Sequence, residues 1–340
     1  MTHHLRPPQV AQTFYQIGQK LAQTELPVTL PQGIASLTSL VGVSPPLPSP
    51  EFSPPLPRDG QPVLSIQHLQ HVYADGTEAL RDVSLQVQAG EYVLIIGQNG
   101  AGKSTLVKHC LNLLQPTAGQ VLVQGRETKG LSVSQLAQSI GYLAQNPDNQ
   151  IFNTTVEREV AFALPYLGYS PTMVKQQTAA SLKAMQLWEE RHLHPLSLPK
   201  GERARIVIAA LLAMQPEIII LDEPTTGQDY RGACAILEVS RQLHQMGKTV
   251  IVITHHLYLM PDYADRVIVM GKGTILLDAP LREAYHQTEL LQSTYLTPPQ
   301  AVLLAQHLGQ LCDRPYPLLT PPELAACFSA PIHHPQEVTP

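Results

Sequence analysis

A glycine-rich stretch, GQNGAGKST at residues 97–105, has the residue types that bind phosphate groups. It fits the pattern G-x-x-x-x-G-K-[S/T] at its four fixed positions, Gly97, Gly102, Lys103 and Ser104. Glycines let backbone N–H groups curl around phosphates, and the N-terminus of a following helix adds its positive dipole end. The lysine reaches the terminal phosphates, and the serine hydroxyl can ligate Mg²⁺. The stretch therefore predicts binding of a nucleoside triphosphate.

The sequence around this stretch supplies the structural context that the motif requires. Residues 91–114, EYVLIIGQNGAGKSTLVKHCLNLL, predict a strand, a glycine-rich turn and a helix. The residues that we expect to contact the nucleotide in this segment are Gly97, Asn99, Gly100, Ala101, Gly102, Lys103, Ser104 and Thr105.

Two further predicted strands end in residues that can hydrolyse a phosphoanhydride. The strand EIIILDEP ends in two adjacent carboxylates, Asp222 and Glu223. We expect Asp222 to hold magnesium through water and Glu223 to polarise the attacking water as a general base. The strand TVIVIT delivers His255 to the same sheet edge, and we interpret His256 as a neighbour only. Together these residues predict a hydrolytic site.

The composition limits the class of protein. The chain has 340 residues, a formal charge of −5 and 14% charged residues, so it lacks the basic footprint of a nucleic-acid-binding protein. Its four cysteines match no metal-binding spacing and predict reduced thiols in a cytosolic protein. No apolar run approaches the roughly 18 residues of a membrane span, so we expect a soluble protein that can dock on a membrane partner.

Proline is concentrated in one segment near the N-terminus. Residues 43–62 hold eight of the 31 prolines, which favours an extended, semi-rigid chain over a packed one. We therefore predict a linker at residues 41–62, and a proline-rich docking peptide is the alternative.

The two ends of the chain resemble each other. Residues 7–37 align without gaps on residues 298–328, and eight of 31 positions are identical, where chance would give about two. We interpret residues 1–40 as the remnant of a preceding ATPase tail, which would make the chain the second half of a split tandem. Two unrelated, proline-rich helical tails are the alternative.

Taken together, the motifs resemble those of the ATP-binding-cassette (ABC) ATPases. Within that family the chain looks like the ATPase subunits of energy-coupling-factor importers of vitamins and metal ions. The resemblance covers about residues 63–330 and rests on GQNGAGKST (97–105), YLAQNPDNQIFNTTVEREVAF (142–162), LDEPTTGQD (221–229), ITHH (253–256) and LTPPQ (296–300).

The resemblance implies an α/β fold, a P-loop nucleoside-triphosphatase core built on a mainly parallel sheet. We expect this ABC ATPase domain at residues 63–280. An antiparallel β subdomain should begin it, and a helical subdomain should lie near residues 146–205. Residues 266–278 predict a hairpin with a Gly-Lys-Gly turn, and residues 281–340 a helical C-terminal accessory region that helps hold the dimer.

The resemblance also assigns roles residue by residue. Tyr73 would stack on adenine, and Gln145 would touch magnesium and couple the site to the membrane subunit. His255 would contact the γ-phosphate, and Asp229 would signal across the dimer. Residues 146–152, NPDNQIF, look like the segment that receives a coupling helix of the transmembrane partner.

One family motif is altered. In these ATPases a Leu-Ser-Gly-Gly-Gln loop at a helix N-terminus closes over ATP held by the opposite subunit. The family places its serine 23 residues before the magnesium aspartate, and here that position is Pro199, whereas Ser197 lies 25 residues before Asp222. Two extra residues would rotate the helix by about 200°. We therefore read LPKGE as the altered loop, with Pro199 and Gly201 facing the partner's nucleotide and Arg205 at the family's arginine position.

The substitution removes a hydroxyl and one N–H that would face phosphate. Lys200 could return a positive charge there, while Glu202 would tend to repel the phosphate. Loss of one such donor can cost roughly 3 kcal/mol, or about 10²–10³ in rate. The site built on this chain's own Lys103, Glu223 and His255 remains complete if the partner supplies an intact loop. The sequence therefore predicts one complete and one impaired half-site.

These features imply an ATP-binding and hydrolysing subunit that powers an energy-coupling-factor-type importer of a vitamin or a metal ion. It would use ATP and Mg²⁺ and lie peripherally on the cytoplasmic face of the membrane. Its expected partners are a second ABC ATPase subunit in a heterodimer, a transmembrane coupling subunit and a substrate-binding membrane subunit, with no nucleic acid.

Other cassette classes fit less well. A chromosome-organising cassette would insert a long coiled coil, but only 95 residues separate Ser104 from Pro199. A translation-associated protein would carry two cassettes and a basic arm. A non-hydrolysing or regulatory cassette with a degenerate signature loop stays open, although Glu223 and His255 argue against it.

Overall fold

The structure of the chain is a computed structural model that describes residues 7–21, 26–43, 47 and 61–328. These residues fall into two units. The larger includes Pro55–Ala284 and Leu290–Leu296, and the smaller includes Arg6–Pro54, Tyr285–Glu289 and Thr297–Pro340. Among the described residues, no helix is both long enough and apolar enough to cross a membrane.

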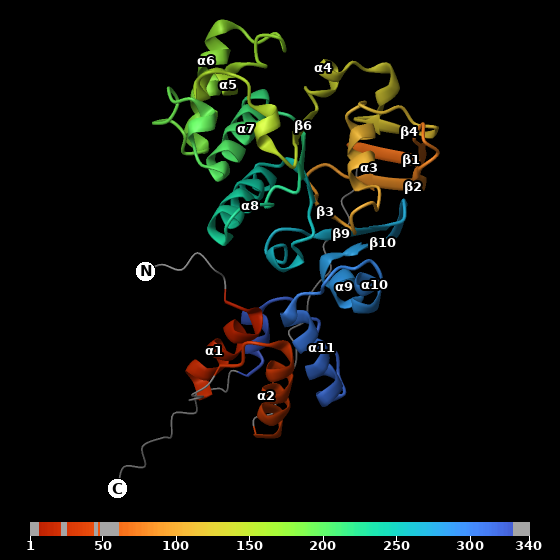
Figure 1. The fold of residues 1–340 in the computed structure, drawn as a ribbon, viewed down its shortest axis with the longest axis vertical. Helices are drawn as coiled ribbons and strands as arrows, with labels where there is room; N and C mark the ends of the chain where they lie inside the picture. The colour runs from red at the N-terminus through yellow and green to blue at the C-terminus, as the bar shows by residue number, and fades with distance from the viewer. Residues whose placement is uncertain (1–6, 22–25, 44–46, 48–60, 329–340) are drawn as a thin grey trace. The chain divides into compact units, whose positions relative to one another are not determined.

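A six-stranded sheet forms the centre of the larger unit, in the order β10-β9-β3-β8-β7-β6 (Figure 1). Its strands are β3 (Tyr92–Ile96), β6 (Ile140–Leu143), β7 (Ile218–Asp222), β8 (Thr249–Ile253), β9 (Arg266–Gly271) and β10 (Thr274–Pro280). All neighbouring pairs are parallel except β9 and β10, which form the predicted hairpin. Every residue of β3, β7 and β8 is buried, as expected for strands that are covered on both faces.

An antiparallel sheet of four strands packs on the same core and confirms the predicted β subdomain. Its order is β2-β1-β4-β5, with β1 (Leu64–Val72), β2 (Glu78–Val87), β4 (Ala118–Val123) and β5 (Arg126–Glu127). Apolar residues of both sheets and of helix α3 (Lys103–Cys110) form one hydrophobic cluster. Helix α3, which follows β3 after the turn at residues 97–102, therefore packs against both sheets.

The remaining elements of the larger unit are mostly helical and include a helical subdomain, as the predicted fold class requires, while its bounds near residues 146–205 stay a prediction. Helix α7 (Lys200–Met214) packs against α5 (Val156–Ala161) and α6 (Pro171–Ala184). Thr155 and Ser170 cap α5 and α6 with their hydroxyls. The other elements are η1 (Thr128–Gly130), α4 (Val133–Leu136), η2 (Pro147–Gln150), η3 (Pro195–Ser197), α8 (Tyr230–Gln245) and η4 (Leu257–Leu259). Two short helices, α9 (Leu281–His286) and α10 (Thr288–Ser293), are divided between the two units.

Among the described residues, four helices from opposite ends of the chain lie wholly within the smaller unit. They are α1 (Gln9–Leu21), α2 (Leu30–Val43), α11 (Gln300–Cys312) and α12 (Pro321–Ala326). Figure 1 shows α1 and α2, in red, beside α11, in blue, and α1 also packs on α12. Their apolar side chains form a second hydrophobic cluster, separate from that of the larger unit.

A buried histidine lies behind the phosphate-loop helix. His109 of α3 is 1% exposed, and its ring centroid is 4.7 Å from that of His71 on β1. Burial, followed by the neighbouring His71, lowers the pKa of His109 from 6.5 to about 4. Between pH 6.5 and about 4, His109 of the folded chain therefore stays neutral, whereas an exposed histidine would be protonated.

This burial predicts acid lability. Because the folded-state pKa lies below the unfolded one, the unfolded chain binds the extra proton, and stability falls as pH drops from 6.5 towards 4. The loss should be roughly 2–3 kcal/mol over that window, measured by urea unfolding. His109→Gln should flatten this part of the pH profile, whereas His192→Gln, at a side chain 69% exposed, should not. Equal profiles for wild type and His109→Gln would contradict the assignment.

Candidate functional site

The predicted phosphate loop connects β3 to α3 and leaves no room for side chains at two positions. A Cβ added at Gly97 would lie 2.4 Å from the carbonyl oxygen of Met270, and one at Gly102 would lie 2.7 Å from that of Ala79. Gly102 also has φ of +100°, a conformation that disfavours other residues. The glycines are therefore required by the neighbouring backbone as well as by the predicted ligand.

The side chain of the loop lysine, Lys103, is hydrogen-bonded to the backbone of the loop itself. Lys103 Nζ donates hydrogen bonds to the carbonyl oxygens of Gly97 at 2.6 Å and Gln98 at 3.0 Å. Burial lowers the pKa of this ammonium, while the charges of Glu223 and Asp222 raise it. A positive charge thus lies inside a glycine-lined turn at a helix N-terminus, which is an arrangement that fits the phosphates of a nucleotide.

The other predicted contact residues of the loop lie at its tip and in the first turn of α3. Asn99 and Gly100 are exposed at the tip, while Ala101 is buried. Ser104 is exposed at the start of the helix. Thr105 is buried, and its hydroxyl is hydrogen-bonded to the phenol of Tyr73 at 3.0 Å.

The two adjacent carboxylates lie at the end of β7, where the parallel sheet delivers them to the loop. Asp222 and Glu223 are 6% and 8% exposed. Burial raises the pKa of Asp222, and the charge of Glu223 raises it further, while the hydroxyl of Tyr142 donates to Asp222 at 3.2 Å and lowers it. Glu223 has φ of +49°, in the left-handed region. The chain therefore turns sharply here and keeps both carboxylates at the sheet edge.

His255 follows β8, the strand next to β7, and contacts the second carboxylate. Its Nδ1 lies 2.9 Å from Oε2 of Glu223. Because an ionised carboxylate only accepts, Nδ1 carries the proton and donates it, which fixes the orientation of the ring. The His255 side chain is 52% exposed, so its other nitrogen remains accessible from outside. His256 is instead hydrogen-bonded to the hydroxyl of Thr225 at 2.8 Å, which agrees with its interpretation as a neighbour.

The remaining predicted residues lie on other segments. Gln145 is exposed just beyond β6. Pro199 is the N-cap of α7, whereas Ser197 belongs to the preceding 3₁₀ turn and donates its hydroxyl to the carbonyl of His194. Pro199 therefore stands at the start of the helix, and Ser197 does not. Gly201 lies against Gln228, in the loop that follows β7.

Sequence reasoning missed the residues that hold residues 146–152 in place. Gln150 accepts a hydrogen bond from the backbone N–H of Ala144 at 2.8 Å and donates one to the carbonyl of Tyr142 at 3.0 Å. At the other end, the carboxylate of Glu159 accepts from the backbone N–H groups of Phe152 at 3.0 Å and Asn153 at 2.7 Å. The segment is therefore anchored at both ends.

An ion pair joins this segment to the altered signature helix. Arg203 on the first turn of α7 contacts Asp148 at 2.8 Å and also donates to the carbonyl of Leu198 at 2.8 Å. Both charged side chains are partly buried. The segment and the start of α7 are therefore in direct contact.

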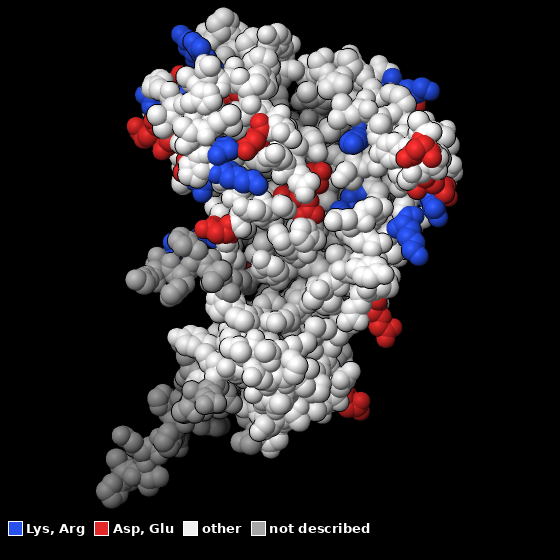
Figure 2. All heavy atoms as spheres, in the orientation of Figure 1, with Lys and Arg blue, Asp and Glu red and all other residues white. Residues whose placement is uncertain are grey.

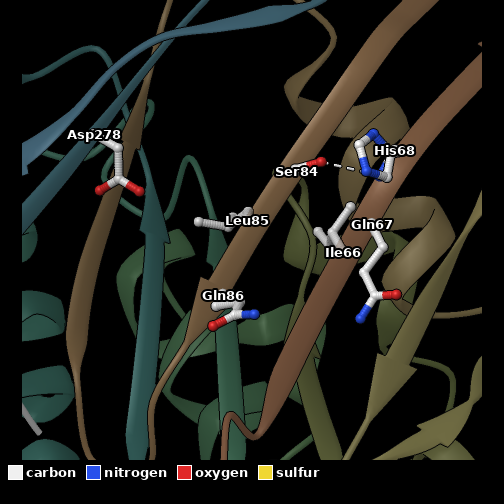
Figure 3. A pocket seen from close by; sticks show the side chains of 7 residues that line it. All are labelled: Ile66, Gln67, His68, Ser84, Leu85, Gln86 and Asp278. Atoms are coloured by element: carbon white, nitrogen blue, oxygen red, sulfur yellow. Dashed lines mark hydrogen bonds between the residues drawn. The ribbon is translucent and has the colours of Figure 1, made fainter.

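A hollow elsewhere on the surface does not share these features. It has a volume of about 420 Å³ and is lined by Ile66, Gln67, His68, Ser84, Leu85, Gln86 and Asp278 (Figure 3). The hydroxyl of Ser84 accepts from the backbone N–H of His68 at 3.0 Å. None of the predicted catalytic or nucleotide-contacting residues lines it, so the phosphate-loop cluster is the stronger candidate site.

Comparisons with known proteins agree with this geometry. The family model described as ABC transporter matches residues 80–226. A putative ABC transporter ATP-binding protein of Methanosarcina acetivorans is 40% identical over 257 residues, which are 76% of this chain and 42% of that protein. The energy-coupling factor transporter ATP-binding protein EcfA of Methanocaldococcus jannaschii is 38% identical over 250 residues, which are 73% of this chain and 90% of that protein.

A solved structure extends the likeness to the fold. CbiO1 of Clostridium perfringens, described as part of the ABC transporter complex CbiONQ, superposes with a TM-score of 0.64 at 30% identity, covering 73% of this chain and 100% of that one. The chain spans about half the length of the long curated relatives that it matches, because the matched part is 42–54% of their length.

The close packing of the phosphate loop gives a direct test of nucleotide binding. Gly102→Ala should weaken binding of a fluorescent ATP analogue by at least about tenfold, because the added Cβ would push the loop off Ala79. Gly130→Ala is the matched control, since a Cβ there would meet nothing within 4 Å. Unchanged affinity in Gly102→Ala would mean that the nucleotide binds elsewhere.

The anchoring carboxylate gives a second test. Glu159→Gln should speed hydrogen exchange at the amides of Phe152 and Asn153 by at least about tenfold, because the amide oxygen of glutamine is a weaker acceptor than a carboxylate oxygen and its NH₂ group cannot accept from either N–H. Glu157→Gln on the same helix, at a side chain 48% exposed, should leave those amides unchanged. Equal exchange rates in the two variants would show that Glu159 does not hold the segment.

Proposed function

Because this chain belongs to the ABC transporter ATPase family, we propose that it binds and hydrolyses ATP to power an energy-coupling-factor-type membrane importer. The observation that carries the proposal is the cluster of Lys103, the buried Asp222–Glu223 pair and His255 at one sheet edge. A purely nucleotide-binding module has no need for a buried carboxylate beside an oriented histidine.

In the proposed mechanism each side chain has a separate task. Glu223 accepts a proton from the attacking water, and its contact with His255 orients that ring towards the γ-phosphate. Lys103 leaves the loop carbonyls and pairs with the phosphates. Ser104, Asp222 and Gln145 would hold Mg²⁺, which neutralises phosphate charge when bound. Tyr73 would stack on the adenine from beside Thr105.

The altered signature loop bears on whether two identical or two different cassettes pair. Pro199 offers neither hydroxyl nor N–H, and its side chain makes no capping bond to α7. In a pair of identical chains both nucleotides would face Pro199. We therefore propose a heterodimer, in which the second cassette supplies an intact loop to this chain's Lys103 and Glu223.

The coupling surface is proposed to lie beside the anchored residues 146–152. Three aromatic side chains form an exposed row there: Phe152, Phe162 and Tyr166 are 64%, 42% and 78% exposed. Their neighbouring ring centroids are 4.6 and 5.4 Å apart. Such a row suits the apolar side of a helix from a membrane subunit at the cytoplasmic face of the membrane. The substrate-binding membrane subunit would then select the vitamin or metal ion.

A regulatory cassette that binds ATP without hydrolysing it is the second candidate. Pro199 at the N-terminus of α7 favours it, because a chain without the serine cannot complete its partner's site. The complete cluster around Glu223 favours hydrolysis. Turnover measurements separate the two.

The function is tested by restoring the signature loop. The wild-type chain alone should hydrolyse ATP slowly, and Pro199→Ser should raise its turnover by roughly 10²-fold, because a phosphate donor returns to both sites. Adding Glu223→Gln to Pro199→Ser should lower turnover at least about 10²-fold while ATP binding is kept. Glu217→Gln, at the opposite end of β7, is the matched control.

Two outcomes would count against the proposal. Brisk turnover by the wild-type chain, unchanged by Pro199→Ser, would favour a homodimer and make the altered loop unimportant. No turnover in Pro199→Ser, together with intact ATP binding, would favour the regulatory cassette.

A further inference from the structure

The four helices of the smaller unit repeat each other along the chain. Helix α1 begins at Gln9 and ends at Leu21, and α11 begins at Gln300 and ends at Cys312, so both ends are displaced by 291 residues. Helices α2 and α12 begin at Leu30 and Pro321, again 291 residues apart. This offset is the one that relates residues 7–37 to residues 298–328 in sequence. The N-terminal helical pair is thus a structural copy of the C-terminal pair.

The two copies contact each other reciprocally. Oε1 of Gln9 accepts a hydrogen bond from the backbone N–H of Ala301 at 3.2 Å, and Oε1 of Gln300 accepts one from the N–H of Val10 at 3.3 Å. Gln9 and Gln300 occupy equivalent positions, as do Val10 and Ala301. Contacts that are exchanged in this way are typical of an interface between two subunits related by a two-fold axis.

Helix packing follows the same exchange. Helix α1 packs against α12, and its equivalent α11 packs against α2, the equivalent of α12. Equivalent core positions are buried on both sides, in the pairs Phe14 and Ala305, Ile17 and Leu308, and Leu37 and Phe328. The interface is apolar: α1, α2, α11 and α12 contain only two charged residues, and Figure 2 shows few charges on the visible face of this unit.

The two copies nevertheless differ in side-chain size where they touch. A Cβ added at Gly33 would lie 2.6 Å from a methyl group of Val10, in the same copy, and 3.3 Å from a methyl group of Leu304, in the other copy, so a larger side chain here would force both neighbours to shift. The equivalent of Gly33 is Leu324, and the equivalent of Leu304 is the smaller Thr13. Gly33 therefore lies opposite the large Leu304. If the exchange of contacts is complete, the large Leu324 lies opposite the smaller Thr13. Two identical C-terminal tails would instead set Leu324 against Leu304, which overpacks the contact.

We propose that the surface formed by α11 and α12 is a docking site for the C-terminal helices of a second cassette. In this chain α1 and α2 occupy that site and take the place of those helices. The identification of the partner as a second cassette rests on the function proposed above. The partner that fits this surface is a tail-like helical pair with a small residue opposite Leu304. A second copy of this chain's own tail does not meet that requirement.

The proposal is tested by exchange in a nicked chain. A protease site is inserted between residues 48 and 60, the purified full chain is cleaved, and the N-terminal fragment should remain bound on size exclusion. Excess synthetic peptide 7–43 should displace it. Peptide 298–328 carrying Leu324→Ala should displace it at a concentration at least about tenfold lower than unmodified peptide 298–328, because the overpacking is relieved.

The outcomes are distinct from those of the turnover assay, because the exchange needs no nucleotide. Phe14→Asp, at a fully buried position, should release the fragment on cleavage, whereas Tyr15→Asp, at a neighbour 55% exposed, should not. The proposal is overturned if peptide 7–43 displaces the fragment and neither form of peptide 298–328 does. It is also overturned if cleavage alone releases the wild-type fragment.

Discussion

Close approach of backbone to backbone around the phosphate loop is the constraint on which the larger unit depends. The backbones of the loop, of the start of β2 and of the β9–β10 turn come into direct contact. Gly273 donates its N–H to the carbonyl of Ala101 at 3.2 Å and accepts a hydrogen bond from the N–H of Arg81 at 2.8 Å. A Cβ at Gly273 would lie 2.8 Å from the carbonyl oxygen of Ala79. Glycine at this turn therefore ties the antiparallel sheet, the central sheet and the loop to one point.

The contact between the loop and the two sheets also determines where the charged residues of the site lie. Because β3, β8 and β7 are parallel neighbours, their ends deliver Lys103, His255 and the carboxylates to the same edge. Burying two adjacent carboxylates is costly unless positive charge and donors are close. Here Lys103 supplies the charge, while Tyr142 and His255 supply hydrogen bonds to Asp222 and Glu223. The cluster is thus stabilised by the same residues that chemistry at a phosphate would use.

The sequence predicted the parts of this site that are encoded locally. A glycine-rich turn after an apolar strand, and acidic or histidine residues after two others, specify their own positions once the strands are parallel. The supports of residues 146–152 could not be predicted in this way. Glu159 looks like one of several surface charges in VEREVA, and only its burial shows that it accepts backbone hydrogen bonds. The Arg203–Asp148 ion pair joins residues 55 apart, and nothing in either local segment indicates the other.

Two unrelated features of the chain bear on whether identical copies could pair. Pro199, at the start of α7, would remove a phosphate donor from the site that we propose to form with another cassette. In the smaller unit, the fit of Gly33 against Leu304 favours two different helical pairs over two identical tails. The first concerns hydrogen bonding at a nucleotide and the second concerns the volume of an apolar contact, so neither is a consequence of the other. In a pair of identical chains, Pro199 would impair both nucleotide sites and Leu324 would overpack against Leu304. In a pair of different cassettes, the second cassette can supply the missing serine and the small side chain. For this reason the asymmetric pair explains the two features with one assumption, and the symmetric pair needs a separate explanation for each.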